Sequence, residues 1–315
     1  MQRYRVVLRF AAMSQDPRLE PALAAVWPGG SPVVTPIEAG ITNRNYRVEV
    51  GEGTFVLRLA GADTELLGID REDEVEAGRV AAAAGIGPEV VAFLPELGCV
   101  VTRFVPGAPI PVERLGEPAV MRSVVASIRT IHACPPIHAT FPVFRIVERF
   151  RDTAAERGVA IPAAYAEAHA IARRIEAAFA AAPMPLTTCH DDLLNANFLL
   201  DGAHTWIVDY EYAGMGDPFF DLGNLSVNNN LDEAAQALLL ETYFGEVRDV
   251  HRARLALMRI VSDLREAMWG VVQQGISKLE FDYVDYADRH FSRLLTNAAD
   301  PQVAGWLEAA AEPAV

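Results

Sequence analysis

One stretch of the chain, residues 187–224, holds most of the polar side chains that could carry chemistry. It reads TTCHDDLLNANFLLDGAHTWIVDYEYAGMGDPFFDLGN. Its polar groups come at predicted turn and strand-end positions, with the apolar runs FLL and WIV between them. His190, Asp192 and Asn197 follow the spacing H-x-D-x-x-x-x-N, and Asp209 comes directly after WIV. Two short strands around the intervening glycine turn would bring Asn197 and Asp209 together.

These residue types at this spacing favour phosphoryl transfer from ATP. The reaction needs an acceptor oxygen held in line, a carboxylate that takes or orients its proton, and Mg²⁺ on the phosphates. The catalytic loop of protein kinases has the pattern H-R-D-x-x-x-x-N, with a later aspartate on the metal. By that template Asp192 is the catalytic base, and Asn197 and Asp209 are the Mg²⁺ ligands. His190 supports catalysis by bracing the loop with hydrogen bonds. Asp191 misses the register, and its role stays open. The alternative is a Ca²⁺-binding acidic loop, but the stretch lacks the dense alternating oxygens of an EF-hand.

Strand patterns dominate the chain before residue 105. The runs VVTPIEA, YRVEV and TFVLRLA predict three short strands, and residues 51–53 between the last two give a hairpin signal. The turn at residues 40–45 could lay its backbone amides over a phosphate. An ordinary hairpin loop is the alternative interpretation of that turn.

One cation, Arg58, lies in the middle of the run TFVLRLA. Because its neighbours are apolar, we expect its side chain to point into a cleft or to lie at a sheet edge. Residues 69–84 predict a helix with acids in its first turn. Glu72, Glu74 and Glu76 of this helix are candidates to pair with Arg58. A solvated acidic face is the alternative for each of them.

Helical patterns dominate the rest of the chain. They fill residues 117–133, 143–157, 163–182, 232–245, 250–275, 282–297 and 301–312, and a shorter one covers residues 16–27. We therefore predict an α+β, protein-kinase-like bilobal fold with a β-rich N-lobe and a mostly helical C-lobe. The N-terminal nucleotide-binding lobe would span residues 1–105, and the catalytic and substrate lobe residues 106–315.

Composition excludes several classes of protein. The net charge of −15 argues against nucleic-acid binding, which needs clustered Lys and Arg, and it would suit a cationic substrate. The three cysteines, Cys99, Cys134 and Cys189, show no metal or disulfide spacing and fit a reducing, cytoplasmic compartment. The apolar stretches are too short for a membrane span. Either Met1 or Met13 could be the native start. The oligomeric state stays open, a homodimer included.

The motifs CHDDLLNANFL, IVDYEYAGMGDPFFDLGN and MWGVVQQGISKLEFDYVDYADRHF together resemble the choline/ethanolamine kinase branch of the aminoglycoside-phosphotransferase-like kinases. The resemblance covers roughly residues 30–297. It implies the same roles for Asp192, Asn197 and Asp209. It also implies that Arg58 grips the ATP phosphates, with Glu74 as its ion-pair partner and Glu72 as the second choice. The residues implied in nucleotide binding are completed by the loop Thr42, Asn43, Arg44 and Asn45 and by the hinge Arg103, Phe104 and Val105.

The resemblance also points to a substrate pocket. Trp269, Tyr283 and Tyr286 match the aromatic cage region of the family, because a quaternary ammonium binds aromatic faces. Packing of these aromatics in a helical core is the alternative. Asp221 begins a D-x-x-N motif that lies at the substrate or supports the loop. Animal choline kinases carry a second tryptophan where this chain has Glu266, and a carboxylate there could hold a cation by charge.

These features together predict an ATP- and Mg²⁺-dependent phosphotransferase with an alcohol group as acceptor. We expect the substrate to be a small cationic amino alcohol, choline first and ethanolamine second. A kinase of the same fold that acts on an aminoglycoside, thiamine or another metabolite is the alternative. A non-catalytic nucleotide-binding pseudokinase is a further reading.

Overall fold

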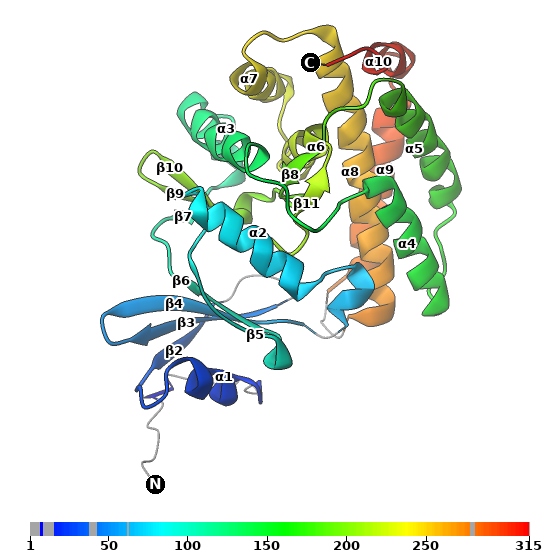
Figure 1. Cartoon of the computed structure of the whole chain (residues 1–315). Coiled ribbons are helices and arrows are strands. Elements are labelled where there is room, and N and C mark those ends of the chain that lie inside the picture. Colours follow the sequence, from blue (N-terminus) through cyan, green and yellow to red (C-terminus); the bar gives the residue numbers. More distant parts are fainter. Residues whose placement is uncertain (1–6, 9–15, 38–42, 62, 278–280, 315) are drawn as a thin grey trace.

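The computed structural model describes residues 7–8, 16–37, 43–61, 63–277 and 281–314. Thr42, predicted in the nucleotide loop, and the two candidate starts, Met1 and Met13, lie outside these residues. A β-sheet forms the N-terminal lobe and helices fill the C-terminal lobe, as Figure 1 shows. This arrangement confirms the predicted fold class. No helix among the described residues combines the length and the apolar character needed to cross a membrane.

Within the described residues, the sheet of the N-terminal lobe has six strands in the order β1-β2-β3-β4-β6-β5. They are β1 (Val7–Leu8), β2 (Val33–Ile37), β3 (Arg44–Val50), β4 (Gly53–Leu59), β5 (Val90–Leu94) and β6 (Cys99–Arg103). Neighbouring strands are antiparallel except β1 and β2. Gly51, in the turn between β3 and β4, has φ 59°, which glycine adopts without strain. The predicted hairpin is therefore confirmed.

The side chains of β4 alternate between a hydrophobic core and a cleft. Leu57 and Leu59 are fully buried and belong to one cluster with Leu23 of helix α1 (Leu19–Val26). Because successive strand residues point to opposite faces, Arg58 points away from this cluster. Its side chain lines the cleft between the lobes, as its place among apolar neighbours predicted.

Helix α2 (Arg71–Ala83) lies between the two lobes. It begins after Asp70, whose carboxylate accepts hydrogen bonds from the backbone amides of Glu72 and Asp73. Its Ala77 and Ala81 pack into the large hydrophobic cluster of the C-terminal lobe and not into that of the sheet. The boundary at residue 105 stays a prediction, and α2, together with Leu67, Ile69 and Ile86 beside it, packs into the core of the C-terminal lobe.

The C-terminal lobe is built from eight helices among the described residues. They are α3 (Pro118–His132), α4 (Val143–Glu156), α5 (Ala164–Ala181), α6 (Pro218–Asn228), α7 (Glu233–Phe244), α8 (Asp249–Ile276), α9 (Tyr283–Ala298) and α10 (Val303–Ala310). Four short 3-10 helices cover Thr64–Leu67, Pro95–Leu97, Val112–Arg114 and Asn195–Asn197. The sequence predicted each α-helix here except α6, whose residues had been assigned to turns and strand ends. That interpretation is wrong, because Asp217 caps a helix with Pro218 in its first turn.

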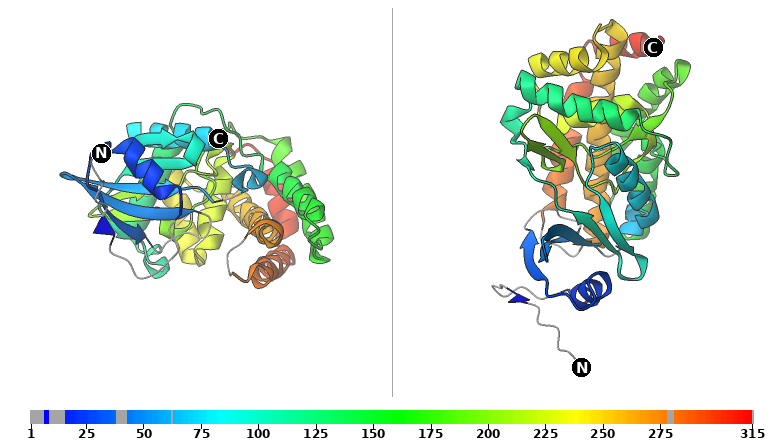
Figure 2. Two further views of the ribbon diagram at one scale, coloured as in Figure 1. Left: turned by 90° about the horizontal axis from the view of Figure 1, so that it is seen from below. Right: turned by 60° about the vertical axis from the view of Figure 1, so that its left-hand side comes forward.

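Helix α8 is the central element of this lobe. It is 28 residues long, and it contacts α4, α6, α9 and α10. Both views in Figure 2 show it running side by side with α9. Most of its residues from Leu255 to Gln273 are buried, charged ones included. Arg254, just before this run, is also buried, and it donates hydrogen bonds to the carbonyls of Ala182 and Ala310, at the C-terminal ends of α5 and α10.

Two small sheets carry the stretch that opened the sequence analysis. One contains β7 (Ala108–Pro109), β9 (Phe198–Asp201) and β10 (His204–Ile207), and the other β8 (Thr187–Cys189) and β11 (Gly214–Gly216). β9 and β10 form the predicted hairpin, in which Phe198 pairs with Ile207. Because Asn197 and Asp209 flank the open end of this hairpin, the turn brings the two close, and the amide of Val208 donates to the carbonyl of Asn197 at 3.0 Å.

Candidate active site

A cleft of about 670 Å³ lies between the lobes. That volume is within the range of about 300–1,000 Å³ usual for small-molecule sites. Thirteen of the predicted site residues line it: Asn43, Asn45, Arg58, Glu74, Arg103, Phe104, Val105, Asp192, Asn197, Asp209, Glu266, Trp269 and Tyr286. Among the described residues, four predicted ones lie outside its lining: Arg44, His190, Asp221 and Tyr283. The cleft thus joins the strands of one lobe to α8 and α9 of the other.

His190 is fully buried beneath the catalytic loop. Its Nδ1 accepts the backbone amide of Asp192 at 3.3 Å, and its Nε2 donates to the carbonyl of Val208 at 3.0 Å. Burial lowers the pKa of His190 below its ordinary value, so the ring is neutral at neutral pH. The imidazole therefore connects the loop to the residue before Asp209 without reaching the cleft itself.

Asp221 lies beneath the same loop, and this corrects its assignment to the substrate pocket. Its side chain is fully buried, and its carboxylate accepts the backbone amides of His190 at 2.9 Å and Asp191 at 2.7 Å. His132 donates a third hydrogen bond at 2.9 Å. Burial would raise the pKa of Asp221, but these hydrogen bonds, led by that of His132, hold it below its usual value. In the same motif Asn224 accepts the amide of Leu193 at 2.6 Å.

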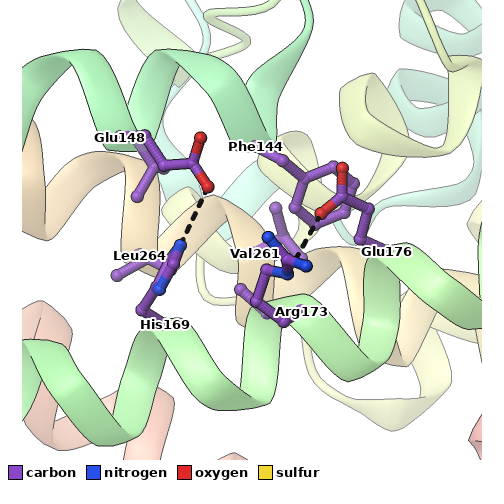
Figure 3. A pocket seen from close by; sticks show the side chains of 9 residues that line it. Phe144, Glu148, His169, Arg173, Glu176, Val261 and Leu264 are labelled. Atoms are coloured by element: carbon purple, nitrogen blue, oxygen red, sulfur yellow. Dashed lines mark hydrogen bonds and ion pairs between the residues drawn. The ribbon is translucent and has the colours of Figure 1, made fainter.

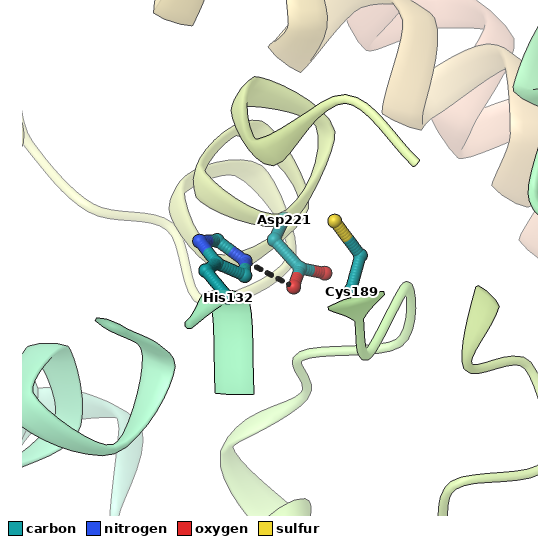
Figure 4. A group of neighbouring side chains, drawn as sticks. All are labelled: His132, Cys189 and Asp221. Carbon is teal, nitrogen blue, oxygen red and sulfur yellow. Dashed lines mark hydrogen bonds and ion pairs between the residues drawn. The ribbon is translucent and has the colours of Figure 1, made fainter. Parts of the chain in front are cut away.

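His132, Cys189 and Asp221 could be mistaken for a metal site, because their ligand atoms lie within 4.8 Å of one another (Figure 4). Each group is engaged otherwise. Asp221 accepts the three hydrogen bonds just described, and His132 Nδ1 bonds the Tyr243 hydroxyl at 2.7 Å. Burial raises the pKa of Cys189 well above its ordinary value, so the sulfur stays a thiol. The cluster supports the loop and does not fit a metal ion.

Asp192 reaches the floor of the cleft, with 16% of its side chain exposed. Burial raises its pKa to about 7, while the neighbouring Arg265 acts in the opposite direction. A carboxylate that titrates near neutral pH can take a proton from a hydroxyl. Asn197 donates its Nδ2 to the carbonyl of Asp192 at 2.9 Å, which leaves the amide oxygen as the group for a metal.

Five charged side chains form one network on the nucleotide side of the cleft. Arg58 pairs with both Glu74 and Asp209. Arg71 pairs with Glu74 at 2.5 Å and with Glu211 at 3.1 Å. Three carboxylates therefore face two guanidinium groups, which leaves an excess of one negative charge. Oxygen donors with excess negative charge fit Mg²⁺, so Asp209 with the nearby Asn197 could hold the ion.

A second charged group lies on the acceptor side. Arg265 Nη1 is 2.7 Å from Glu266 Oε1 and 3.4 Å from Asp192 Oδ1. The guanidinium carbon lies 4.3 Å from the centre of the Tyr212 ring, and the Tyr212 hydroxyl accepts the indole N–H of Trp269 at 3.0 Å. Burial would lower the pKa of Arg265, but Glu266 and Asp192 together raise it above its usual value. Arg265 is therefore charged at any relevant pH.

Sequence reasoning missed Arg71, Glu211, Tyr212 and Arg265. Arg265 and Glu211 did carry a signal. Arg265 lies beside Glu266 in the middle of a helical pattern, and Glu211 follows Asp209 at the alternate position. Sequence patterns also did not show that two backbone amides of the predicted hinge are already engaged: those of Arg103 and Phe104 donate to the carbonyls of Glu89 and Thr54.

The predicted aromatic cage is only partly present. Tyr283 packs edge-on against Trp269, with ring centres 5.8 Å apart, and its hydroxyl bonds Ser277 at 2.8 Å. Trp269 is 5% exposed, and Tyr286 packs against it at 5.5 Å. Tyr286 alone of the three is more than marginally exposed.

Arg44, predicted in the nucleotide loop, lies away from the cleft lining, 3.8 Å from Asp16 and largely exposed.

A second hollow lies among α4, α5 and α8 (Figure 3). Its volume is about 10 Å³, which is no larger than the space of one water molecule. Glu148 and His169 face each other across it at 3.1 Å. It is too small to bind a substrate.

Comparison with known proteins gives four findings. The model of the phosphotransferase enzyme family matches residues 33–257. A crystal structure of a choline/ethanolamine kinase family protein from Mesorhizobium loti is 32% identical with a TM-score of 0.80, and the match covers 93% of this chain and 99% of that one. Ethanolamine kinase 2 of Rattus norvegicus is 26% identical over 81% of this chain and 73% of its own length. Choline kinase LicA from Streptococcus pneumoniae shares the fold, with a TM-score of 0.76 and 19% identity over 89% of this chain and 97% of its own.

Proposed function

Because this chain belongs to the phosphotransferase enzyme family, and within it to the choline/ethanolamine kinases, we propose that it transfers the γ-phosphoryl group of ATP to the hydroxyl of a small cationic amino alcohol. The chain is a phosphotransferase acting on an alcohol group. What we propose beyond this is that ATP is the phosphoryl donor, that the reaction uses Mg²⁺, and that the acceptor is a cation.

One observation carries the proposal: two charged groups in the cleft each have one negative charge in excess, and Asp192 belongs to the second of them. On one side Glu74, Asp209 and Glu211 face two arginines. On the other side Asp192 itself and Glu266 face Arg265 alone. A metal ion bound on the first side and a cationic acceptor bound on the second would each neutralise the excess negative charge there. The acceptor hydroxyl would then meet the phosphoryl group at Asp192.

The residues of the chain have separate tasks in this mechanism. Asp192 orients the acceptor hydroxyl and takes its proton as the acceptor oxygen bonds to the γ-phosphorus, while the bond from that phosphorus to the bridging oxygen breaks and ADP leaves. Arg58, now paired with Asp209, is placed to contact the phosphates of ATP. Asn197 and Asp209 would hold Mg²⁺, which supplies neutralising charge to the phosphates when bound.

The nucleotide base would lie at the other end of the cleft. Asn45, Phe104 and Val105 line that end. The amide of Phe104 is already bonded within the sheet, so an adenine edge would use the carbonyls of this segment or the backbone of Val105. Asn43 is held in place by a 2.9 Å hydrogen bond to Glu211 and lies at the start of β3, beside the phosphate end.

An ATP-consumption assay with Mg²⁺ tests the proposal against choline, ethanolamine, thiamine and several aminoglycosides. We expect turnover with an amino alcohol and a loss of at least about a hundredfold in kcat for Asp192→Ala, because general base catalysis contributes about that much. Asp192→Ala should keep its affinity for ATP. The proposal is refuted if no acceptor raises ATP consumption above that with water, or if Asp192→Ala turns over as fast as the wild type. ATP binding without turnover would identify a pseudokinase instead.

A further inference from the structure

The charged side chains on the acceptor side of the cleft have one negative charge in excess. Asp192 and Glu266 are two carboxylates, and Arg265, with 2% of its side chain exposed, is the guanidinium that contacts both. The next carboxylate along α8, Asp263, also bonds His290 at 2.8 Å, but Arg293 at 2.6 Å already balances its charge, so Asp263 does not need the cation of the acceptor. An excess buried negative charge is costly unless a cation accompanies it. The acceptor is the molecule that can supply that cation.

The aromatic surfaces on this side are largely used up by packing. Both Tyr283 and Tyr286 pack against Trp269 edge to face, with ring centres 5.8 and 5.5 Å from it. Its indole N–H is fixed on the Tyr212 hydroxyl. A quaternary ammonium needs several open aromatic faces because it has no hydrogen to donate. Tyr286 gives at most one such face.

Polar acceptors take the place of an aromatic cage. Tyr286 donates its hydroxyl to Glu266 Oε2 at 2.7 Å, and both residues line the cleft. Asn228 Nδ2 and Arg265 Nη1 both donate to the other oxygen, Oε1. A carboxylate oxygen accepts more than one hydrogen bond, so Oε2 and the Tyr286 hydroxyl can each accept an N–H from a ligand.

The distances fit a short amino alcohol. Arg265 Nη1 lies 3.4 Å from Asp192 Oδ1 and 2.7 Å from Glu266 Oε1, so those two oxygens are at most about 6 Å apart. The ligand-accepting Oε2, about 2 Å from Oε1 in the same carboxylate, is then at most about 8 Å from Asp192 Oδ1. A hydroxyl bonded to Asp192 and an ammonium bonded to the Glu266 carboxylate would therefore be separated by a spacer of two or three carbons.

We propose that Glu266 is a specificity-determining residue that selects acceptors whose ammonium group carries N–H, so that primary and secondary amino alcohols are preferred over quaternary ones. Arg265, Asn228 and Tyr286 hold its carboxylate in place. This inference rests on the proposed function and narrows the acceptor within it.

A methylation series tests the inference on the wild-type protein. The acceptors are ethanolamine, its N-methyl and N,N-dimethyl derivatives, and choline, each assayed with ATP and Mg²⁺ for kcat/KM. We expect a fall of about tenfold or more at the last step, where the final N–H is lost, because one hydrogen bond to a charged group is worth about that factor. If choline is used as well as or better than ethanolamine, the inference is overturned while the proposed function stands. If none of the four is phosphorylated, the proposed function itself fails, and the inference with it.

Two variants show whether Glu266 causes the preference. Glu266→Gln keeps the size and removes the charge, so the ratio of kcat/KM for ethanolamine to that for choline should fall by about tenfold with KM for ATP unchanged. An unchanged ratio overturns the assignment, even if both rates fall equally through Asp192. Glu148→Gln is the matched control, because Glu148 is also ion-paired but lies in the hollow of Figure 3, outside the cleft. It should leave the ratio as in the wild type.

Discussion

Replacement of Asp221 by asparagine tests how the catalytic loop is held. The wild-type carboxylate accepts the amide of Asp191 with Oδ1, and the amide of His190 together with Nε2 of His132 with Oδ2. Asparagine has one acceptor oxygen, so in either orientation its NH₂ group faces at least one of these donors. The variant keeps the volume of the side chain and removes the charge.

The expected cost follows from the three hydrogen bonds. Each bond to a charged group contributes about 1.5–3 kcal/mol, and the contributions are not additive when the bonds share one carboxylate. When one partner of a buried charged interaction is removed, the protein loses about 3–5 kcal/mol of stability. We therefore expect Asp221→Asn to lower the free energy of unfolding by about 3–5 kcal/mol, out of a total of about 5–15 kcal/mol for a typical protein. The kcat should fall as well, because Asp192 is in the same loop.

Urea unfolding followed by circular dichroism measures this change, with the slope m compared between the proteins. Asp152→Asn is the matched control, because Asp152 is largely exposed and pairs only with Arg151 on the surface of α4. The control should unfold close to the wild type. If Asp221→Asn also unfolds within about 1 kcal/mol of the wild type, below the cost of one charged hydrogen bond, the reasoning is refuted.

Two further substitutions should change the free energy of unfolding in a known direction. Burial and the charge of Asp221 raise the pKa of Asp191 well above its usual value, so the wild type binds a proton on folding and loses stability as the pH rises above about 4, the unfolded value. Asp191→Asn, which tolerates the φ of 63° at this position, should therefore gain more stability at pH 8 than at pH 5 in urea unfolding, and an equal effect at both pH values contradicts this. Arg254→Met leaves the carbonyls of Ala182 and Ala310 without their charged donor. It should lower the free energy of unfolding by about 2–4 kcal/mol in the same assay and leave kcat unchanged. A loss of activity in the folded variant would instead place Arg254 in the active site.

Much of the catalytic arrangement was predictable because it is local. Asn197 and Asp209 are separated by a hairpin whose turn and apolar runs can be read directly, so their proximity follows from the strand pattern. Arg58 is a similar case, because alternation along one strand decides which way it points. In each instance the deciding information lies within about 15 residues of chain.

The features that could not be predicted from the sequence depend on which elements pack against each other in the fold. α6 is buried on all sides, so it lacks the amphipathic period that identifies a surface helix. Asp221 was misplaced for the same reason, since its partners are the backbone of a loop some 30 positions earlier. The contact of Arg265 with Asp192 joins residues 73 positions apart, and sequence patterns do not specify such a pair.

Arg265 and Glu266 also constrain how the sequence can diverge. Loss of Arg265 alone would leave Asp192 and Glu266 without their shared cation, at a cost of about 3–5 kcal/mol, which is a large share of the stability of a typical protein. Loss of Glu266 alone would remove the nearer of the two partners of Arg265. A simultaneous exchange of both for uncharged residues avoids that intermediate. Among descendants of a common ancestor, the two positions should therefore change together, and a change of acceptor preference should appear as an abrupt step between lineages and not as a gradual drift.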